Sequence, residues 1–187
     1  HDVAKPATKT VGQDGRIRFL GHPREGARMA RTVLQRLRLS HASVDLVERM
    51  IENHLRPGQM GHGDEFPSPR AIYRYYRDLG EAAVATLYLN LGDFLAARGP
   101  GLELEKWRRH VTIISHVLEM GLRACSDEVV ARLVDGHDLI RVFGLEPGPV
   151  LGRILVALEE AQSIGEIKTR KEALAMVRGL IHSGGVF

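Results

Sequence analysis

The sequence lacks several features that define common classes of protein. Among its 187 residues there is one cysteine, Cys125, so an intrachain disulfide is impossible and a cysteine-based zinc site is excluded. No run approaches the roughly 18 uninterrupted apolar residues that a membrane span needs, and the first residues form no apolar signal-peptide core. We therefore expect a soluble, cytoplasmic protein in a reducing compartment, with no membrane contact.

The overall amino-acid composition is typical of a folded protein. Hydrophobic residues make up 44% of the chain and charged residues 26%, which excludes intrinsic disorder for most of it. Lys and Arg number 26 against 23 Asp and Glu, for a net charge of +3. Basic residues are locally enriched in the segment 16–38, which makes an anionic partner plausible.

Helical periodicity dominates, and no convincing alternation of apolar and polar residues predicts a strand. This pattern predicts an all-α fold. After residues 132–135 the sequence contains two turn signals and two shorter helical segments. We therefore expect a helical domain over 1–133 and a smaller helical tail, with two helices, over 134–187. In the first domain the expected helices span 23–39, 70–79, 81–97 and 104–123, with a short further helix over 125–133. A further helix, capped by Ser40 or Ser43, includes His54 and is stopped by residues 56–58.

Five polar residues are candidate metal ligands in the first domain. His1 and Asp2 form an adjacent pair, and His54 continues the apolar stripe of its helix. Asp93 lies in a segment that is apolar on most sides, where an ionised carboxylate needs a cationic partner. His22 precedes a proline at a helix start. Imidazole and carboxylate groups suit divalent transition metals and Mg²⁺ or Mn²⁺ at a phosphate-cleaving centre.

Three of these residues also have a simpler interpretation. A lone buried histidine such as His54 usually bonds to a carbonyl group, and His22 could be exposed in a loop. Asp93 could share a thin polar edge with Asn90 and Arg98. The groups must converge to within a few ångströms to bind one ion, because bonds from a transition metal to its ligands are only about 2 Å long.

Two stretches of sequence carry a family resemblance. HDVAKPAT, followed by GRIRFLGHPREGARMARTVLQRLRLS and IENHLRP, resembles the HD domain of bacterial CCA-adding enzymes and related poly(A) polymerases. DGHDLIRVFGLEPGPVLGRILVALEEAQSIGEIKTRKEALAMVR resembles the tail of the same nucleotidyltransferase family. The resemblance implies an HD-like helical bundle followed by a tail. It also implies a divalent metal held by His1 and Asp2 as the His-Asp pair, Asp93 as the distant aspartate, and His22 and His54 as additional ligands.

The resemblance also implies catalytic roles for two residues, and it shows which motifs of the family this sequence does not contain. Asp2 and Lys5 would orient water and phosphate, because Lys5 matches the lysine that often follows the pair. The family's upstream histidine is absent because the chain starts at His1, so we expect a fragment with an incomplete metal set. The Gly-Ser turn and paired aspartates of the catalytic head are not found, so this chain alone is not expected to add nucleotides.

The tail that resembles the family is expected to bind RNA, and the RNA is expected to be tRNA. Glycines in VFGLEPGPVLGRIL would let backbone N–H groups approach a phosphate at a helix N-terminus, with basic side chains adding charge. A tight helix–helix turn with a solvated charged helix is the simpler alternative. His137 and Asp138 belong to the tail motif and are not assigned to metal. The residues expected to contact RNA are Gly148, Gly152, Arg153, Lys168, Arg170 and Lys171.

Three functions fit the sequence. The first is an RNA-binding body and tail of a tRNA nucleotidyltransferase or poly(A) polymerase. The second is a metal-dependent HD phosphohydrolase acting on nucleotides or RNA phosphoesters. The third is a helical module for homo-oligomerisation.

Two aromatic and basic stretches, 73–77 and 107–109, could stack on a nucleotide but are assigned to no site, because such rings are more often buried.

Overall fold

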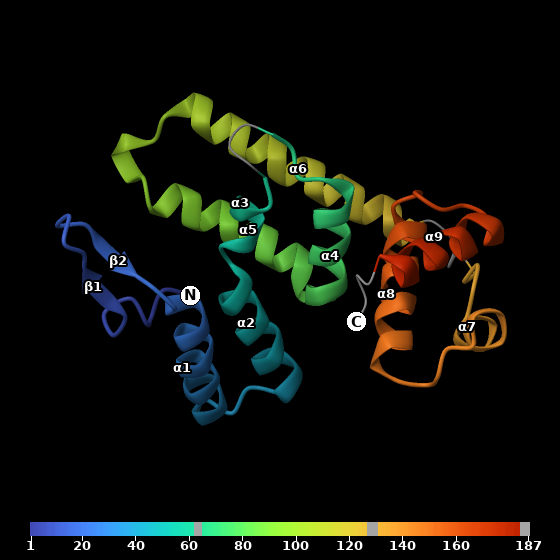
Figure 1. Ribbon diagram of the computed structural model, residues 1–187. Helices are drawn as coiled ribbons and strands as arrows, with labels where there is room; N and C mark the ends of the chain where they lie inside the picture. Colours follow the sequence, from blue (N-terminus) through green and yellow to red (C-terminus); the bar gives the residue numbers. More distant parts are fainter. Residues whose placement is uncertain (62–64, 127–130, 184–187) are drawn as a thin grey trace. The chain divides into compact units, whose positions relative to one another are not determined.

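The computed structural model describes residues 1–61, 65–126 and 131–183, and the described chain is helical apart from one small hairpin (Figure 1). The predicted all-α fold is confirmed. The chain divides into two compact units, His1–Met120 and Gly121–Phe187. The predicted division into 1–133 and 134–187 stays a prediction. Within the described residues no helix is both long and apolar enough to cross a membrane.

The first unit begins with the hairpin, continues through a helical pair and ends in a three-helix layer. Its strands are β1 (Lys9–Val11) and β2 (Ile17–Phe19), and its helices are α1 (His22–Arg36), α2 (His41–Asn53), α3 (Arg56–Gln59), α4 (Pro69–Leu79), α5 (Ala82–Ala96), η1 (Gly99–Gly101) and the start of α6 (Leu104–Ser126). Ser40 and Ser68 cap α2 and α4 with their side-chain oxygens, as expected of serine before a helix.

The hairpin was not predicted. β1 and β2 pair antiparallel, with Lys9 opposite Phe19 and Val11 opposite Ile17. Strands of three residues are too short to produce a detectable alternation, and the only turn signal is Asp14-Gly15, where Gly15 has a positive φ of 72°. The helix expected to stop before residues 56–58 does end there, because α2 finishes at Asn53. The same residues then begin the short α3, which was not predicted and whose first turn tolerates proline.

The first unit buries a core between α4, α5 and α6. Tyr75, Leu79 and Leu87 are at most 1% exposed, and Ile114 and Val117 of α6 pack in the same cluster. Helices α1 and α2 pack against each other, and α2 also packs on α5 (Figure 1). The C-terminal end of α2 is thereby held against the middle of α5.

The second unit is built from α7 (Gly136–Phe143), α8 (Pro149–Ser163) and α9 (Arg170–His182), around a core that includes Leu139, Ile154 and Val177. Two tail helices were expected, and α7 is the one missed, because eight residues give a weak periodic signal. The short helix expected over 125–133 is not found where the chain is described: α6 runs to Ser126 and residues 131–133 are not helical. The rest of that expectation lies outside the described residues.

Candidate metal centre

The five predicted ligands come together where the N-terminal segment meets α1, α2 and α5. His22 is the first residue of α1, and His54 is the residue that ends α2. Asp93 lies on α5. His1 and Asp2 precede the hairpin. The three that lie close enough together to hold one ion are His1, Asp2 and His54, and His22 and Asp93 contact this group. Binding of metal by any of the five stays a prediction.

Two of the histidines are oriented by backbone carbonyl groups. The Nδ1 atom of His22 lies 2.7 Å from the carbonyl oxygen of Phe19, and Nδ1 of His54 lies 2.7 Å from that of Ile51. A carbonyl oxygen can only accept, so Nδ1 carries a proton in both rings, and in its neutral form each ring presents an Nε2 lone pair. Carbonyl partners of this kind fix the tautomer and direction of metal-ligating histidines.

The two Nε2 atoms point at the same place. They are 3.3 Å apart, and Oδ1 of Asp2 lies 3.5 Å from that of His22 and 3.9 Å from that of His54. Oδ1 of Asp2 is also buried, with no hydrogen-bond donor among the described residues. Three acceptors therefore face one another without a donor between them, an arrangement that a cation would relieve.

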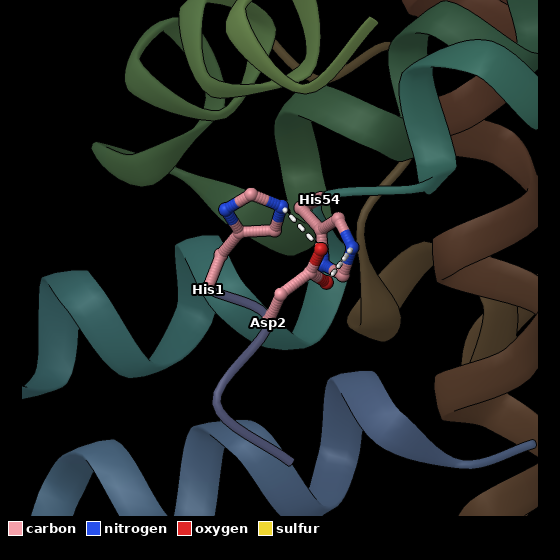
Figure 2. Close-up of side chains that lie close together, drawn as sticks. All are labelled: His1, Asp2 and His54. Carbon is pink, nitrogen blue, oxygen red and sulfur yellow. Dashed lines mark ion pairs between the residues drawn. The ribbon is translucent and has the colours of Figure 1, made fainter. Parts of the chain in front are cut away.

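His1 connects this group to Asp93. Its Nε2 atom lies 3.2 Å from Oδ1 of Asp93 and 3.3 Å from Oδ2 of Asp2. Figure 2 shows the Asp2 carboxylate between the imidazole rings of His1 and His54. One ligand atom from each of these three residues lies within 4.8 Å of the others. Asp93 faces inward, with its side chain 20% exposed, so the alternative of an outer polar edge does not describe it.

Some of these separations match those between adjacent ligands of one transition metal ion: the pairs His22 and His54, His1 and Asp2, and His1 and Asp93 are 3.2 to 3.3 Å apart, whereas Oδ1 of Asp2 lies farther from His22 and His54, at 3.5 and 3.9 Å. Two ligand atoms that are each about 2.1 Å from one ion are about 3.0 to 3.4 Å apart in octahedral or tetrahedral geometry. Burial lowers the pKa of His54, with the nearby His22 contributing and the bond to Ile51 opposing. A neutral imidazole is the form that binds metal.

Lys5 is the cation already present beside the group. Its Nζ atom lies 2.5 Å from Oδ2 of Asp2, on the oxygen away from the histidine pair, and its side chain is 36% exposed. Lys5 can therefore reach both Asp2 and a ligand arriving from solvent. This position fits the predicted role in pairing with a phosphate.

Asn90 is part of the arrangement and was missed as such from the sequence. It is 6% exposed, and its Nδ2 atom donates to the backbone carbonyl of His54 at 2.9 Å. It therefore fixes the end of α2 that presents His54. The available signal was its spacing, because Asn90 and Asp93 are three residues apart and share one face of α5.

The predicted RNA contacts of the tail lie on the surface of the second unit. Gly148 precedes α8, and a side chain added at Gly148 or Gly152 would meet nothing within 4 Å. Arg153, Lys168 and Lys171 are exposed. The backbone and basic groups that were expected to meet a phosphate are thus accessible.

Arg170 differs from the other predicted contacts because it is engaged within the tail. Its guanidinium donates to both carboxylate oxygens of Asp138 at 2.6 Å and to the carbonyl of Leu133 at 3.2 Å. These bonds hold the pKa of Asp138 well below its usual range. Asp138 also closes a capping box with Asp135 at the start of α7, in keeping with its exclusion from the metal set.

The aromatic stretch of α4 is mainly structural. Tyr75 is fully buried and donates from its hydroxyl group to the carbonyl of Ala83 at 2.6 Å. Arg74 and Arg77 are exposed. The rings are thus largely turned inward and the arginines outward, as in the more common of the two arrangements considered.

Comparison with known proteins points to one group of enzymes. Residues 131–177 match the family model of tRNA nucleotidyltransferase domain 2. A CC-adding tRNA nucleotidyltransferase of Thermus thermophilus is 34% identical over 180 residues, covering 95% of this chain and 37% of the relative. An A-adding tRNA nucleotidyltransferase of Deinococcus radiodurans is 34% identical over 182 residues, covering 95% of this chain and 39% of the relative. No solved structure shows a significant match.

Proposed function

This chain belongs to the tRNA nucleotidyltransferase family, and we propose that it forms the body and tail with which such a protein holds RNA during 3′-end processing. The observation that carries the proposal is the similarity to two tRNA nucleotidyltransferases along 95% of the chain, through both units. The chain spans 37% and 39% of those relatives, and it lacks the motifs of the nucleotide-adding head. Its role is therefore to bind and position tRNA.

The surface of the tail supports this role. Lys168 and Lys171 are exposed near the start of α9, and the open backbone at Gly148 begins a helix of 15 residues. Backbone N–H groups at the start of such a helix favour an anion, and lysines add sequence-independent contacts to phosphate. Besides its predicted contact with RNA, Arg170 holds α9 to α7 through Asp138.

The test is tRNA binding as a function of salt. Affinity for tRNA is expected to fall steeply between 50 and 200 mM salt, as for proteins that release counterions from phosphates. The double variant Lys168→Gln and Lys171→Gln should bind more weakly and reduce the log–log slope by about 1 to 2. Lys106→Gln, which removes an exposed lysine paired with Glu103 in the other unit, is the matched control. Equal affinity and slope in all three proteins would contradict the proposed tail contacts.

The centre of the first unit supports a second function, a metal-dependent phosphohydrolase of the HD type. The supporting observation is the group of three acceptors formed by Asp2, His22 and His54. A divalent ion held there would polarise a phosphoryl oxygen and lower the pKa of bound water. The protein's own contributions are the fixed Nε2 lone pairs, the carboxylates of Asp2 and Asp93, and the Lys5 ammonium group positioned to pair with a phosphate.

Metal binding is measured directly as well as through activity. Calorimetric titration with Mn²⁺ or Co²⁺ is expected to give about one site, and Co²⁺ bound to imidazole and carboxylate should show visible absorption. Asp2→Asn should abolish binding and any hydrolysis of a phosphodiester. Asp14→Asn, which alters an exposed carboxylate paired with Arg18 on the hairpin, should leave both unchanged. A wild-type chain that binds no metal would overturn this second function without affecting tRNA binding.

A further inference from the structure

The chain turns a corner where α5 passes through η1 into α6 (Figure 1). Planar side chains of both helices stack at this corner. The Phe94 and His110 rings are nearly parallel, at 15°, with centroids 4.1 Å apart. Trp107 lies beside both, with centroids 5.8 Å from Phe94 and 6.4 Å from His110. We call Phe94, Arg98, Trp107 and His110 the corner stack.

Arg98 covers the outside of this stack. Its guanidinium carbon lies 3.4 Å from the centroid of the Phe94 ring, and its Nη1 atom donates to the carbonyl of Phe94 at 3.0 Å. The side chain is exposed. A flexible arginine is thus held against an aromatic ring while its side chain remains exposed, so it has less conformational entropy to lose on binding.

Arg98 also differs from its cationic neighbours in its partners. Lys106 pairs with Glu103 and Arg108 with Glu105, each within one turn of α6. Among the residues that the structure describes, Arg98 has no carboxylate within ion-pair distance. Its positive charge is therefore available to an anionic ligand.

The supporting rings carry no second charge. Burial lowers the pKa of His110, and the charge of Arg98 lowers it further, so that the imidazole stays neutral near pH 7. The stack offers one planar cation on an apolar support. A guanidinium plane of this kind stacks on a nucleobase while its N–H groups bond to phosphate or base edges.

The geometry points to a nucleobase-binding platform: we propose that the exposed face of Arg98, supported by Phe94, His110 and Trp107, stacks on an unpaired base of an RNA strand. This inference rests on the proposed RNA-binding function and adds a contact in the first unit. Phe94 directly follows Asp93 on α5, and Arg98 lies two residues beyond the end of that helix.

Trp107 provides a direct test, because it is the chain's only tryptophan and belongs to the corner stack. The probes are a single-stranded octamer of adenosine ribonucleotides and an abasic ribose-phosphate octamer of the same length. The adenosine octamer is expected to change Trp107 fluorescence and to bind about tenfold more tightly than the abasic one, since stacking contributes to only the first.

The decisive variant is Arg98→Lys, which keeps the charge and removes the plane. It should weaken binding of the adenosine octamer about tenfold and leave binding of the abasic octamer within twofold of wild type. Arg108→Lys is the matched control, because Arg108 is equally a surface arginine of this corner but is paired with Glu105, and it should change neither. Circular dichroism of each variant checks that the helices are intact.

The outcomes separate this inference from the function on which it rests. If tRNA binds with the expected salt dependence while Arg98→Lys changes nothing and Trp107 fluorescence is constant, the platform is refuted and the tRNA-binding function stands. If neither tRNA nor the octamers bind, both are refuted. Equal binding of the adenosine and abasic octamers also refutes the platform and leaves the corner stack as a structural feature or a contact for a protein.

Discussion

Replacing Gly26 by alanine tests how closely the segment that carries His1 and Asp2 packs on α1. A Cβ atom at this buried glycine would lie 3.1 Å from the carbonyl oxygen of His1, 3.4 Å from Cγ2 of Ile51 and 3.7 Å from Cβ of Ala4. The carbonyl contact is tighter than nine in ten real Cβ contacts, so the backbone of His1 must shift by a few tenths of an ångström.

Two effects of the substitution oppose each other. In a helix interior, alanine is favoured over glycine by about 0.5 to 1 kcal/mol. The displaced His1 backbone offsets this gain and moves the neighbouring imidazole and carboxylate. Metal sites tolerate changes in ligand distance of only about 0.2 Å, and disturbing the groups that orient ligands typically costs about 10- to 100-fold in affinity. We expect Gly26→Ala to give no net stabilisation and to weaken Mn²⁺ or Co²⁺ binding at least tenfold.

Gly92→Ala is the matched control in the same unit. Gly92 is exposed within α5, and an added Cβ there would meet nothing within 4 Å. This variant should show the full helix gain of about 0.5 to 1 kcal/mol in urea unfolding and unchanged metal affinity. If Gly26→Ala is stabilised as much as Gly92→Ala and binds metal equally well, the close packing derived for the N-terminal segment is wrong.

Three further substitutions test the packing of each unit. Tyr75→Phe removes the bond to the Ala83 carbonyl and should lower the free energy of unfolding by about 1 kcal/mol at pH 7. Burial raises the pKa of Tyr75, so the wild-type protein should lose stability relative to this variant as the pH rises above about 10, where the tyrosine of the unfolded chain ionises. If urea unfolding gives the same difference in free energy between the two proteins at pH 7 and at pH 11, this expectation is wrong. Leu139→Ala leaves a cavity at a fully buried position and should lower the free energy of unfolding of the second unit by about 2 to 5 kcal/mol. The measurement is amide hydrogen exchange in α7, α8 and α9, which should become faster; unchanged exchange would contradict the prediction. Thr169→Ala removes a capping box shared with Glu172 and should cost about 0.5 to 2 kcal/mol in thermal unfolding, and an unchanged melting temperature would argue against the cap.

Sequence patterns predicted most of the helices and pointed individually to His54 and Asp93 as candidate ligands. The apolar stripe that places His54 inward and the apolar surroundings of Asp93 both report burial, and burial of polar groups on separate helices brings them together. The expected set of five needed the family resemblance, since no spacing in the sequence connects His1 with Asp93, 92 residues apart.

The features that were missed depend on contacts that a linear pattern does not contain. The hairpin has strands of three residues, and α7 is eight residues long, so neither produces a full periodic signal. Arg170 reads as a surface charge in the sequence, and its bond to Asp138 is visible only once α7 and α9 are adjacent. The corner stack joins residues of α5 and α6 across a Gly-Pro-Gly turn, which sequence spacing alone does not align.

The bond between Arg170 and Asp138 has a consequence for synthesis of the tail on the ribosome. Arg170 begins α9, while Asp138 and Leu133 belong to the start of the unit, 32 and 37 residues earlier. This contact with the beginning of α7 therefore forms only after α9 has left the ribosome, and it closes a loop over the segment between Asp138 and Arg170. A nascent chain that stops before residue 170 would leave the Asp138 carboxylate without its main cation, so the tail is expected to fold only after translation has passed α9.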